Sequence, residues 1–272
     1  ILSRGTAAGV LLSGLAAGAA AEVASAWVTA PESQVRLVAG GGGSVPLTAG
    51  VEMRLSPGWK TYWRTPGDAG GVPPFFDFAG SQNVAGTSVL YPAPKRYSDK
   101  AGDTIGYKDT VTFPILVTPE DGKGATAIRL KFEYGICREI CIPAEASLAL
   151  DVPAAGAGSL PEALKQMLAR VPGDAATALP ALRKSEVVLA GGKPHIIVEA
   201  EFAADETHAD AFVEAPDGIY VPMTKMVMAT GAVRRFEIDL TAGADPADLK
   251  GKFLTVTLVG DKGQSAARIK AE

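Results

Sequence analysis

The chain has few of the residues that build disulfide frameworks and metal sites, with only two cysteines and two histidines among 272 residues. Its Lys and Arg residues never occur more than two in a row, and the net charge is −4. This charge pattern gives little support to nucleic-acid binding or to docking on an anionic membrane. Beyond residue 26, no apolar run approaches the length of a membrane span, about 18 residues. We therefore expect a mature chain that does not span the membrane, with no nucleic-acid partner and no metal or other cofactor.

The chain is rich in apolar residues (47%), and it contains 31 glycines and 19 prolines. The apolar fraction is sufficient for one large domain or two ordinary domains, each with its own core. The many glycines and prolines favour turns over long helices.

The N-terminal segment 1–26 is predicted to be a signal peptide. Arg4 provides a positive charge, residues 7–21 form an apolar stretch rich in Ala and Gly, and Ala24-Ser25-Ala26 fits the small-residue pattern of a cleavage site. An uncleaved membrane anchor is the alternative, but Glu22 interrupts the apolar stretch before it reaches spanning length. We expect export to a bacterial periplasm, where exposed thiol pairs depend on dedicated redox partners.

The rest of the chain is predicted to be all-β, with two immunoglobulin-like β-sandwich domains joined by a short helical linker. Period-2 alternation is clearest in residues 128–134, where apolar side chains occupy every second position, as in a strand with one buried face. Short segments with strand composition, separated by Gly, Pro or Asp, fill residues 27–153 and again residues 185–272. Between them, residues 154–184 form a linker in which residues 161–171 have the apolar spacing of a short helix.

Cys137 and Cys141 are separated by three residues, and this pair is the feature with the clearest chemical meaning. A bridge that closes a loop of about five residues stabilises a protein by roughly 2 kcal/mol, against ~4.7 kcal/mol for a hundred-residue loop. A bridge that serves stability would be expected to span more of the chain, which favours a bridge that exchanges. Either a hairpin loop or one helical turn would bring the two sulfurs within bonding distance.

Cysteine spacing alone leaves three interpretations open: an inert local bridge, a redox-active pair and part of a metal site. The metal site has the least support, because two thiolates need further ligands and both histidines, His195 and His208, lie in the second block. Arg138 beside the pair favours a thiolate and Glu139 opposes it, so the sequence does not fix the pKa of either thiol.

Several separated motifs favour the redox interpretation. Residues 58–74 read GWKTYWRTPGDAGGVPP, residues 91–94 read YPAP, residues 106–107 read GY, and residues 134–143 read YGICREICIP. In this order and spacing, residues 30–153 resemble the N-terminal periplasmic domain of the DsbD protein-disulfide reductases, and most closely the ScsB-like branch. The second block is similar to the additional sandwich of ScsB-type proteins, although no sharp motif marks it.

The resemblance implies a redox-active disulfide between Cys137 and Cys141 that passes electrons from a membrane-embedded thiol reductase to periplasmic thioredoxin-fold proteins and other clients. In this family a short cap loop with an aromatic residue shields the disulfide, and Tyr97 lies where that loop falls. The family also has acidic residues near its cysteines, a role that Asp99 or Asp103 would fill. The resemblance adds no metal or other cofactor.

Full-length members of the family continue into membrane helices and a thioredoxin-like domain, and neither follows within this chain. The resemblance therefore implies that electrons come from a membrane-embedded reductase on a separate chain. It also implies that the more C-terminal cysteine, Cys141, is the nucleophile and that Cys137 resolves the mixed disulfide. The predicted activity is that of a protein-disulfide reductase, or of an electron relay alone.

A second hypothesis is a non-catalytic module that binds partners or handles copper, with a structural disulfide. Met223, Met226 and Met228 suggest copper, because thioethers are soft ligands suited to Cu(I). Met226 and Met228 are two residues apart on a predicted strand and would share one face, which is also the spacing of core residues. We therefore expect these methionines to fill the core. Tyr134 is expected to point into the core as well, with a gating role at the disulfide as the alternative.

Overall fold

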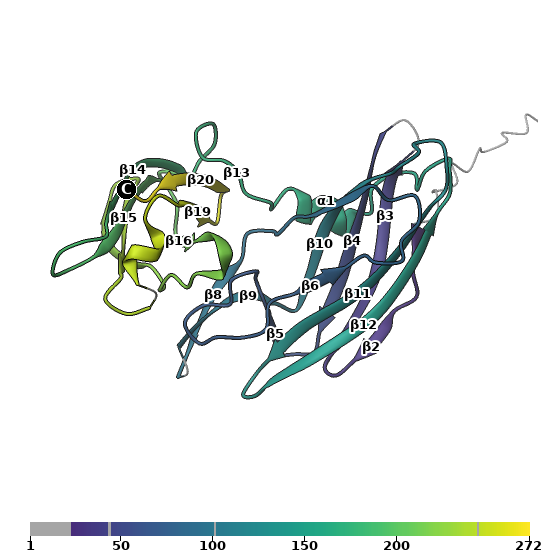
Figure 1. Cartoon of the computed structure of the whole chain (residues 1–272), viewed down its shortest axis with the longest axis horizontal. Helices are drawn as coiled ribbons and strands as arrows, with labels where there is room; N and C mark the ends of the chain where they lie inside the picture. Colours follow the sequence, from purple (N-terminus) through teal and green to yellow (C-terminus); the bar gives the residue numbers. More distant parts are fainter. Residues whose placement is uncertain (1–22, 43–44, 101, 244) are drawn as a thin grey trace, which may run out of the picture.

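The computed structural model describes residues 23–42, 45–100, 102–243 and 245–272. Within them the chain forms two β-sandwiches that lie next to each other along the long axis of the molecule (Figure 1). One short α-helix lies between them in the sequence. The predicted fold class, all-β with two immunoglobulin-like sandwiches, is confirmed.

The first sandwich consists of two six-stranded antiparallel sheets. The strands of one sheet are β1 (Val23–Ala24), β2 (Val28–Ala30), β3 (Ser33–Gly42), β4 (Val45–Leu55), β7 (Gly86–Val89) and β10 (Thr110–Thr118), in the order β1-β3-β4-β10-β7 with β2 beside β3. The strands of the other are β5 (Lys60–Tyr62), β6 (Phe75–Asp77), β8 (Lys95–Asp99), β9 (Gly102–Lys108), β11 (Thr126–Cys137) and β12 (Cys141–Val152), in the order β12-β11-β5-β9-β8 with β6 beside β11.

The core of the first sandwich follows the alternation along β11. Every second residue from Ile128 to Ile136 is at most 2% exposed. Phe132 stacks on Tyr134 with ring centroids 4.7 Å apart, and Phe113 of the opposite sheet lies 6.4 Å from Phe132. Burial of side chains of this size contributes about 1.5–3 kcal/mol each, so the orientation of the strand is strongly specified. Cys137 follows Ile136 directly and therefore faces the outer side of the sheet.

The second sandwich consists of two four-stranded sheets. The strands of one are β13 (Gly173–Asp174), β16 (Ala209–Glu214), β19 (Phe253–Gly260) and β20 (Gln264–Lys270), in the order β13-β20-β19-β16. The strands of the other are β14 (Ala181–Val188), β15 (His195–Glu201), β17 (Lys225–Thr230) and β18 (Val233–Asp239), in the order β14-β15-β18-β17. Two short 3-10 helices, η1 (Pro216–Gly218) and η2 (Pro246–Leu249), lie in the connections.

The predicted linker helix is present as α1 (Glu162–Leu168), shorter than the apolar spacing over residues 161–171 indicated. It packs on β4 and β10, and Leu164 is fully buried there. The helix is therefore part of the surface of the first sandwich (Figure 1). In the part of the chain that the structure describes, no helix is long and apolar enough to cross a membrane.

Most of the predicted signal peptide lies outside the described residues, which begin at Val23. Val23 and Ala24 pair with Ala39 and Val38 at the edge of the first sandwich. Cleavage after Ala26 stays a prediction.

The methionines of β17 do not fill the core, so that prediction was wrong. Met226 is 52% exposed and Met228 is 37% exposed, because β17 is the edge strand of its sheet. A bulge at Val227 shifts the pairing with β18, so that Met226 lies opposite Phe236 and Met228 lies opposite Arg235. Cross-strand partners share a face and successive residues of β18 face opposite sides. The two thioethers therefore lie on opposite faces, and this strand does not bring them together for copper.

Candidate redox site

The two cysteines lie opposite each other at the end of a long β-hairpin. β11 and β12 pair continuously from Thr126 opposite Val152 to Cys137 opposite Cys141. Residues 138–140 form the connecting loop, closed by a 3.1 Å hydrogen bond from the backbone N–H of its first residue to the carbonyl of its last. The Cα atoms of the cysteines are 4.1 Å apart and their sulfurs are joined in a disulfide. Of the two arrangements that the spacing allowed, the hairpin is the one present.

The two sulfur-bearing residues differ in exposure. Cys137 is 8% exposed, whereas Cys141, at the start of the returning strand, is exposed. Attack on a disulfide requires access to one of its sulfurs. An incoming thiolate therefore reaches the Sγ of Cys141 more readily than the Sγ of Cys137.

The disulfide lines a pocket of about 380 Å³. On one side of the pocket is the loop between β5 and β6, which contributes Ala69 and Gly70. On another side is the β8–β9 hairpin, which contributes Asp99, Lys100 and Thr104. The pocket thus has two walls that come from separate segments of the first sandwich.

Tyr62 of β5 donates a hydrogen bond to Cys141. Its Oη lies 2.9 Å from the Sγ, and the tyrosine O–H is the donor because a disulfide sulfur carries no proton. Burial and, second, the carboxylate of Asp99 raise the pKa of Tyr62 above its ordinary value of 10.0. The hydroxyl therefore keeps its proton at neutral pH. In the reduced protein the same O–H is placed to stabilise a thiolate on Cys141.

Two glycines leave room for the Tyr62 ring. A Cβ on Gly135 of β11 would lie 2.9 Å from the Cε2 of Tyr62, and a Cβ on Gly71 would overlap the other edge of the ring. Contacts this close are not tolerated without movement of the ring or the backbone. The ring therefore fits between β11 and the loop after β5, which gives a physical reason for the glycines in the GGVPP and YGIC segments.

An ion pair with a buried lysine lies beside the disulfide. Lys60 of β5 pairs with Cys137 of β11, so their side chains share the outer face of the sheet. The Nζ of Lys60 is 2.9 Å from the Oδ2 of Asp99, and the lysine side chain is only 6% exposed. A lysine charge near a thiol favours the thiolate, and the carboxylate of Asp99 opposes this effect in part.

Comparison with known proteins found two similarities. Residues 28–153 match the family model described as "Thiol:disulfide interchange protein DsbD, N-terminal". The first sandwich is therefore similar to DsbD N-terminal domains over almost its whole length. The crystal structure of the N-terminal periplasmic domain of ScsB from Proteus mirabilis is similar, with a TM-score of 0.72 and 22% identity over 93% of this chain and 100% of that chain. This likeness in fold extends over both sandwiches. A comparison with curated proteins found no match.

Of the predicted supporting residues in the first sandwich, Asp99 lines the pocket and Tyr97 does not. Tyr97 pairs with Thr104, a lining residue, and so shares the outer face of the sheet. Its ring lies against the Nζ of Lys108, 4.3 Å from the ring centroid. The segment around Tyr97 is the regular strand β8 rather than an open loop. Its role as a shield stays a prediction.

Asp103 and Tyr134 lie outside the pocket lining. Asp103 accepts hydrogen bonds from Ser98 at 2.6 Å and from Arg96 at 2.9 Å. Burial would raise the pKa of Asp103, but these hydrogen bonds outweigh it and hold the pKa below its usual range. Tyr134 is fully buried and hydrogen-bonded to Ser33 at 2.8 Å, which confirms its predicted orientation into the core.

The sequence alone does not identify Lys60 and Tyr62 as residues of the site. β5 has only three residues, which is too short for period-2 alternation to show which side chains share a face. Both residues belong to the GWKTYWRTPG motif that carried the resemblance. The missing information was the pairing of this motif with β11, which places Lys60 opposite Cys137.

Tyr62→Phe is expected to raise the pKa of the Cys141 thiol in the reduced domain by about one to two units. The substitution removes a hydrogen bond to a charged group, which contributes about 1.5–3 kcal/mol, and one pKa unit corresponds to ~1.4 kcal/mol. The rate of alkylation by iodoacetamide as a function of pH reports the thiolate. The midpoint of this profile should lie at higher pH in the variant.

Tyr134→Phe is the matched control for this measurement. It removes a tyrosine hydroxyl from the same domain, but one that is bonded to Ser33 on the core side of the sheet. The alkylation midpoint should stay at its wild-type position. Equal shifts in the two variants would show that Tyr62 has no specific effect on the thiolate.

Proposed function

We propose that the protein is a periplasmic thiol–disulfide exchange protein that relays electrons between a membrane-embedded reductase and thioredoxin-fold clients through Cys137 and Cys141. The exposure of Cys141 at an open pocket is the observation that carries this proposal, because exchange needs access to a sulfur. Tyr62 and Lys60 support it, since a hydroxyl donor and a positive charge both favour a thiolate in the pocket. The family match of the first sandwich supports the same class of chemistry.

Reduction of a client proceeds in two exchange steps. The thiolate of Cys141 attacks one sulfur of the client disulfide, so that a mixed disulfide forms and the other client sulfur leaves as a thiolate and takes up a proton. The thiolate of Cys137 then attacks the Sγ of Cys141, which re-forms the intramolecular disulfide and releases the second client thiolate, which is protonated in turn. Two electrons pass to the client, and Cys137 and Cys141 are oxidised.

Recharging follows the same chemistry with the roles exchanged. A thiolate of the membrane reductase attacks the Sγ of Cys141, the bond to Cys137 breaks, and Cys137 leaves as a thiolate. The second thiolate of the reductase then attacks the mixed disulfide and releases Cys141. The reductase is oxidised by two electrons. Ile140, 65% exposed between the cysteines, provides an apolar contact for a docked partner.

A redox titration distinguishes an exchanging disulfide from a structural one. The wild-type protein is equilibrated in dithiothreitol buffers of graded potential, and its free thiols are measured by labelling. The midpoint is expected to lie above about −300 mV, the upper limit for typical structural disulfides. A midpoint below that value, with no oxidation of the reduced protein by an oxidised thioredoxin-fold protein, would contradict the proposal and favour a structural bridge.

A further inference from the structure

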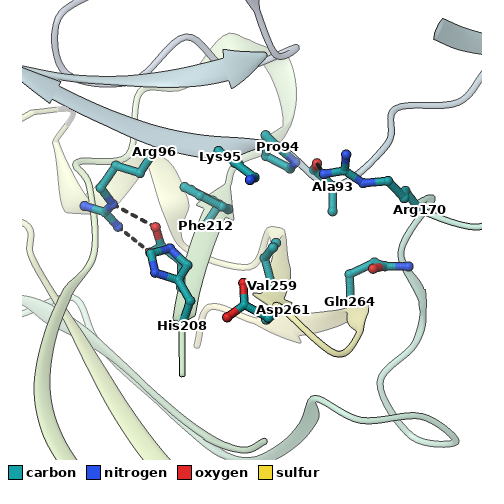
Figure 2. Close-up of a pocket in the computed structure, with 12 residues that line it drawn as sticks. Ala93, Pro94, Lys95, Arg96, Arg170, His208, Phe212, Val259, Asp261 and Gln264 are labelled. Carbon is teal, nitrogen blue, oxygen red and sulfur yellow. Dashed lines mark hydrogen bonds and ion pairs between the residues drawn. The ribbon is translucent and has the colours of Figure 1, made fainter. Parts of the chain in front are cut away.

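One wall of the disulfide pocket is tied to the second sandwich through Arg96. This residue of β8 forms a bidentate ion pair with Asp210 of β16, at 2.9 and 2.6 Å, shown by the dashed lines in Figure 2. It also donates to the carbonyl and to the hydroxyl oxygen of Thr224, each at 2.9 Å. Another N–H of the same guanidinium donates to Asp103 of β9 at 2.9 Å. Arg96 thus joins both strands of the β8–β9 hairpin to the second sandwich, which is also where Figure 1 places this hairpin.

The other wall, the loop between β5 and β6, is anchored in the same way. Arg64 forms a bidentate ion pair with Glu214 of β16, with its Nε 2.8 Å from Oε1 and its Nη2 2.7 Å from Oε2. Asp68 accepts a hydrogen bond from the O–H of Tyr220 at 2.6 Å and another from the N–H of Met223 at 3.1 Å. Asp68 directly precedes the part of the loop that lines the pocket.

The two anchored walls are also bonded to each other. The N–H of Ala69 donates to the carbonyl of Asp103 at 3.0 Å, and the N–H of Ile105 donates to the carbonyl of Pro66 at 2.8 Å. A shift of either wall therefore acts on the other. Since both walls are bonded to β16 or to the segment after it, the second sandwich holds these two walls of the pocket.

Direct polar contacts of Arg96 tie the hairpin wall to the second sandwich. A cavity of about 280 Å³ lies between the two sandwiches beside Arg96, lined by residues of both (Figure 2). Phe212 packs across the junction: its ring lies 5.8 Å from that of Trp63 in the other wall, and the guanidinium of Arg96 lies over it, 5.8 Å from the ring centroid. Asp210 is only 8% exposed, and removal of its charge takes away one of the two carboxylates that compensate the partial burial of Arg96. The position of the hairpin should therefore depend strongly on this ion pair.

We propose that the second sandwich positions the two walls of the pocket and thereby limits access to the disulfide. Asp210 and Glu214 are the positioning residues. Arg96 carries the constraint along β8 to Asp99, which lines the pocket three residues further on. When the ion pairs to the second sandwich are lost, the two walls move together away from the disulfide and the Sγ of Cys141 becomes easier to attack. This inference rests on the proposed exchange function of the cysteines.

The test measures reduction of the folded, oxidised full-length protein by dithiothreitol. A thiolate of the reagent attacks the Sγ of Cys141, the bond to Cys137 breaks, and the second reagent thiolate closes the ring of oxidised dithiothreitol, which leaves two protein thiols. Asp210→Asn and Glu214→Gln each remove one anchor without changing a residue that lines the disulfide pocket. We expect each variant to be reduced at least about five times faster, as for a coupling of ordinary strength between two sites.

Glu201→Gln is the matched control. It removes an ion pair with Arg183 that lies within the second sandwich and makes no contact with the pocket walls. Its rate of reduction should equal that of the wild type. Amide hydrogen exchange should increase in β8 and β9 of the Asp210 and Glu214 variants and stay unchanged in β3 and β4, since only the walls are released.

A double-mutant cycle separates positioning from a general loss of stability. If Asp210 acts through the hairpin, the effects of Asp210→Asn and Asp99→Asn on the rate of reduction should not be additive. The effects of Asp210→Asn and Glu201→Gln should be additive, because the two sites share no partner. Additivity in both pairs would contradict the route through Asp99.

Unchanged rates of reduction in both anchor variants would overturn the proposal, and so would an equal increase in Glu201→Gln. A variant that has lost its fold is recognised by increased hydrogen exchange throughout β3 and β4. The rate of reduction of the other anchor variant then decides whether the proposal holds. Loss of the fold in both variants would also overturn it, since the anchors would then only support the structure. Dithiothreitol reduces the disulfide without a protein partner, so this test does not depend on exchange with a thioredoxin-fold protein. If the rates rise as expected but no thioredoxin-fold partner exchanges, the proposed function fails while the positioning role stands.

Discussion

Replacement of Cys137 by serine is expected to convert the protein into a trap for its partner. Cys141 remains as the only thiol, exposed at the pocket and beside the O–H of Tyr62. It can attack the disulfide of a partner, but no second thiol is present to resolve the mixed disulfide. After incubation with an oxidised thioredoxin-fold protein, most of the variant should run on a non-reducing gel as a complex that dithiothreitol dissociates. Turnover of the partner should be lost.

Cys141→Ser is the matched variant, and it should trap the partner poorly. The thiol that it retains, on Cys137, is 8% exposed, so it reaches a partner disulfide less often. Equal yields of complex from the two variants would contradict the assignment of Cys141 as the attacking residue. No complex from either variant would contradict the exchange function itself.

Gly135→Ala is expected to lower the free energy of unfolding of the first sandwich by about 1–3 kcal/mol, the usual cost of overpacking a filled site. The new Cβ would lie 2.9 Å from the Cε2 of Tyr62 and equally close to the carbonyl oxygen of Val72. Both sides of the added methyl group are thus occupied, and the tyrosine ring is the part that can move. Its hydroxyl should then leave Cys141. Denaturant unfolding measures the loss of stability, and the pH profile of alkylation should shift upward as in Tyr62→Phe.

Gly86→Ala provides the comparison for this change. Gly86 also lies in a strand, β7, but an added Cβ there has no atom within 4 Å. The substitution should change the free energy of unfolding by no more than about 0.5 kcal/mol, as for most surface changes. If the two variants were equally stable, the close fit around Tyr62 would not be a source of stability.

The orientation of the disulfide could be predicted because β11 has a clear pattern. Apolar residues at alternate positions up to Tyr134 predict which face is buried, and Cys137 has the opposite parity. The pairing of β11 with β12 then leaves three residues for the loop, which predicts that the cysteines face each other. Local pattern thus predicts the face of Cys137, but the cysteine spacing left a hairpin and a helical turn open, and the pairing of β11 with β12 decides for the hairpin.

The surroundings of the disulfide could not be predicted in the same way. β5 has three residues and β8 has five, so each is identified by its partners rather than by its own pattern. Arg96 and Asp210 are separated by 114 residues, and nothing near either one indicates the other. On β17, a one-residue bulge reversed the face that Met228 would otherwise share with Met226. Such features depend on how distant segments meet, and spacing along the chain does not contain that information.

The segment after β12 determines where an expressed fragment that contains the first sandwich can end. The N–H of Ala157 donates to the carbonyl of Gly41 at 2.6 Å, and the N–H of Ala93 donates to the carbonyl of Arg170 at 2.7 Å. A fragment that stops at residue 153 would leave the carbonyl of Gly41 and the N–H of Ala93 without these partners and would expose the apolar surface that Leu164 covers. An expressed fragment that is meant to carry the cysteines alone should therefore extend through Arg170, well past the end of the family match.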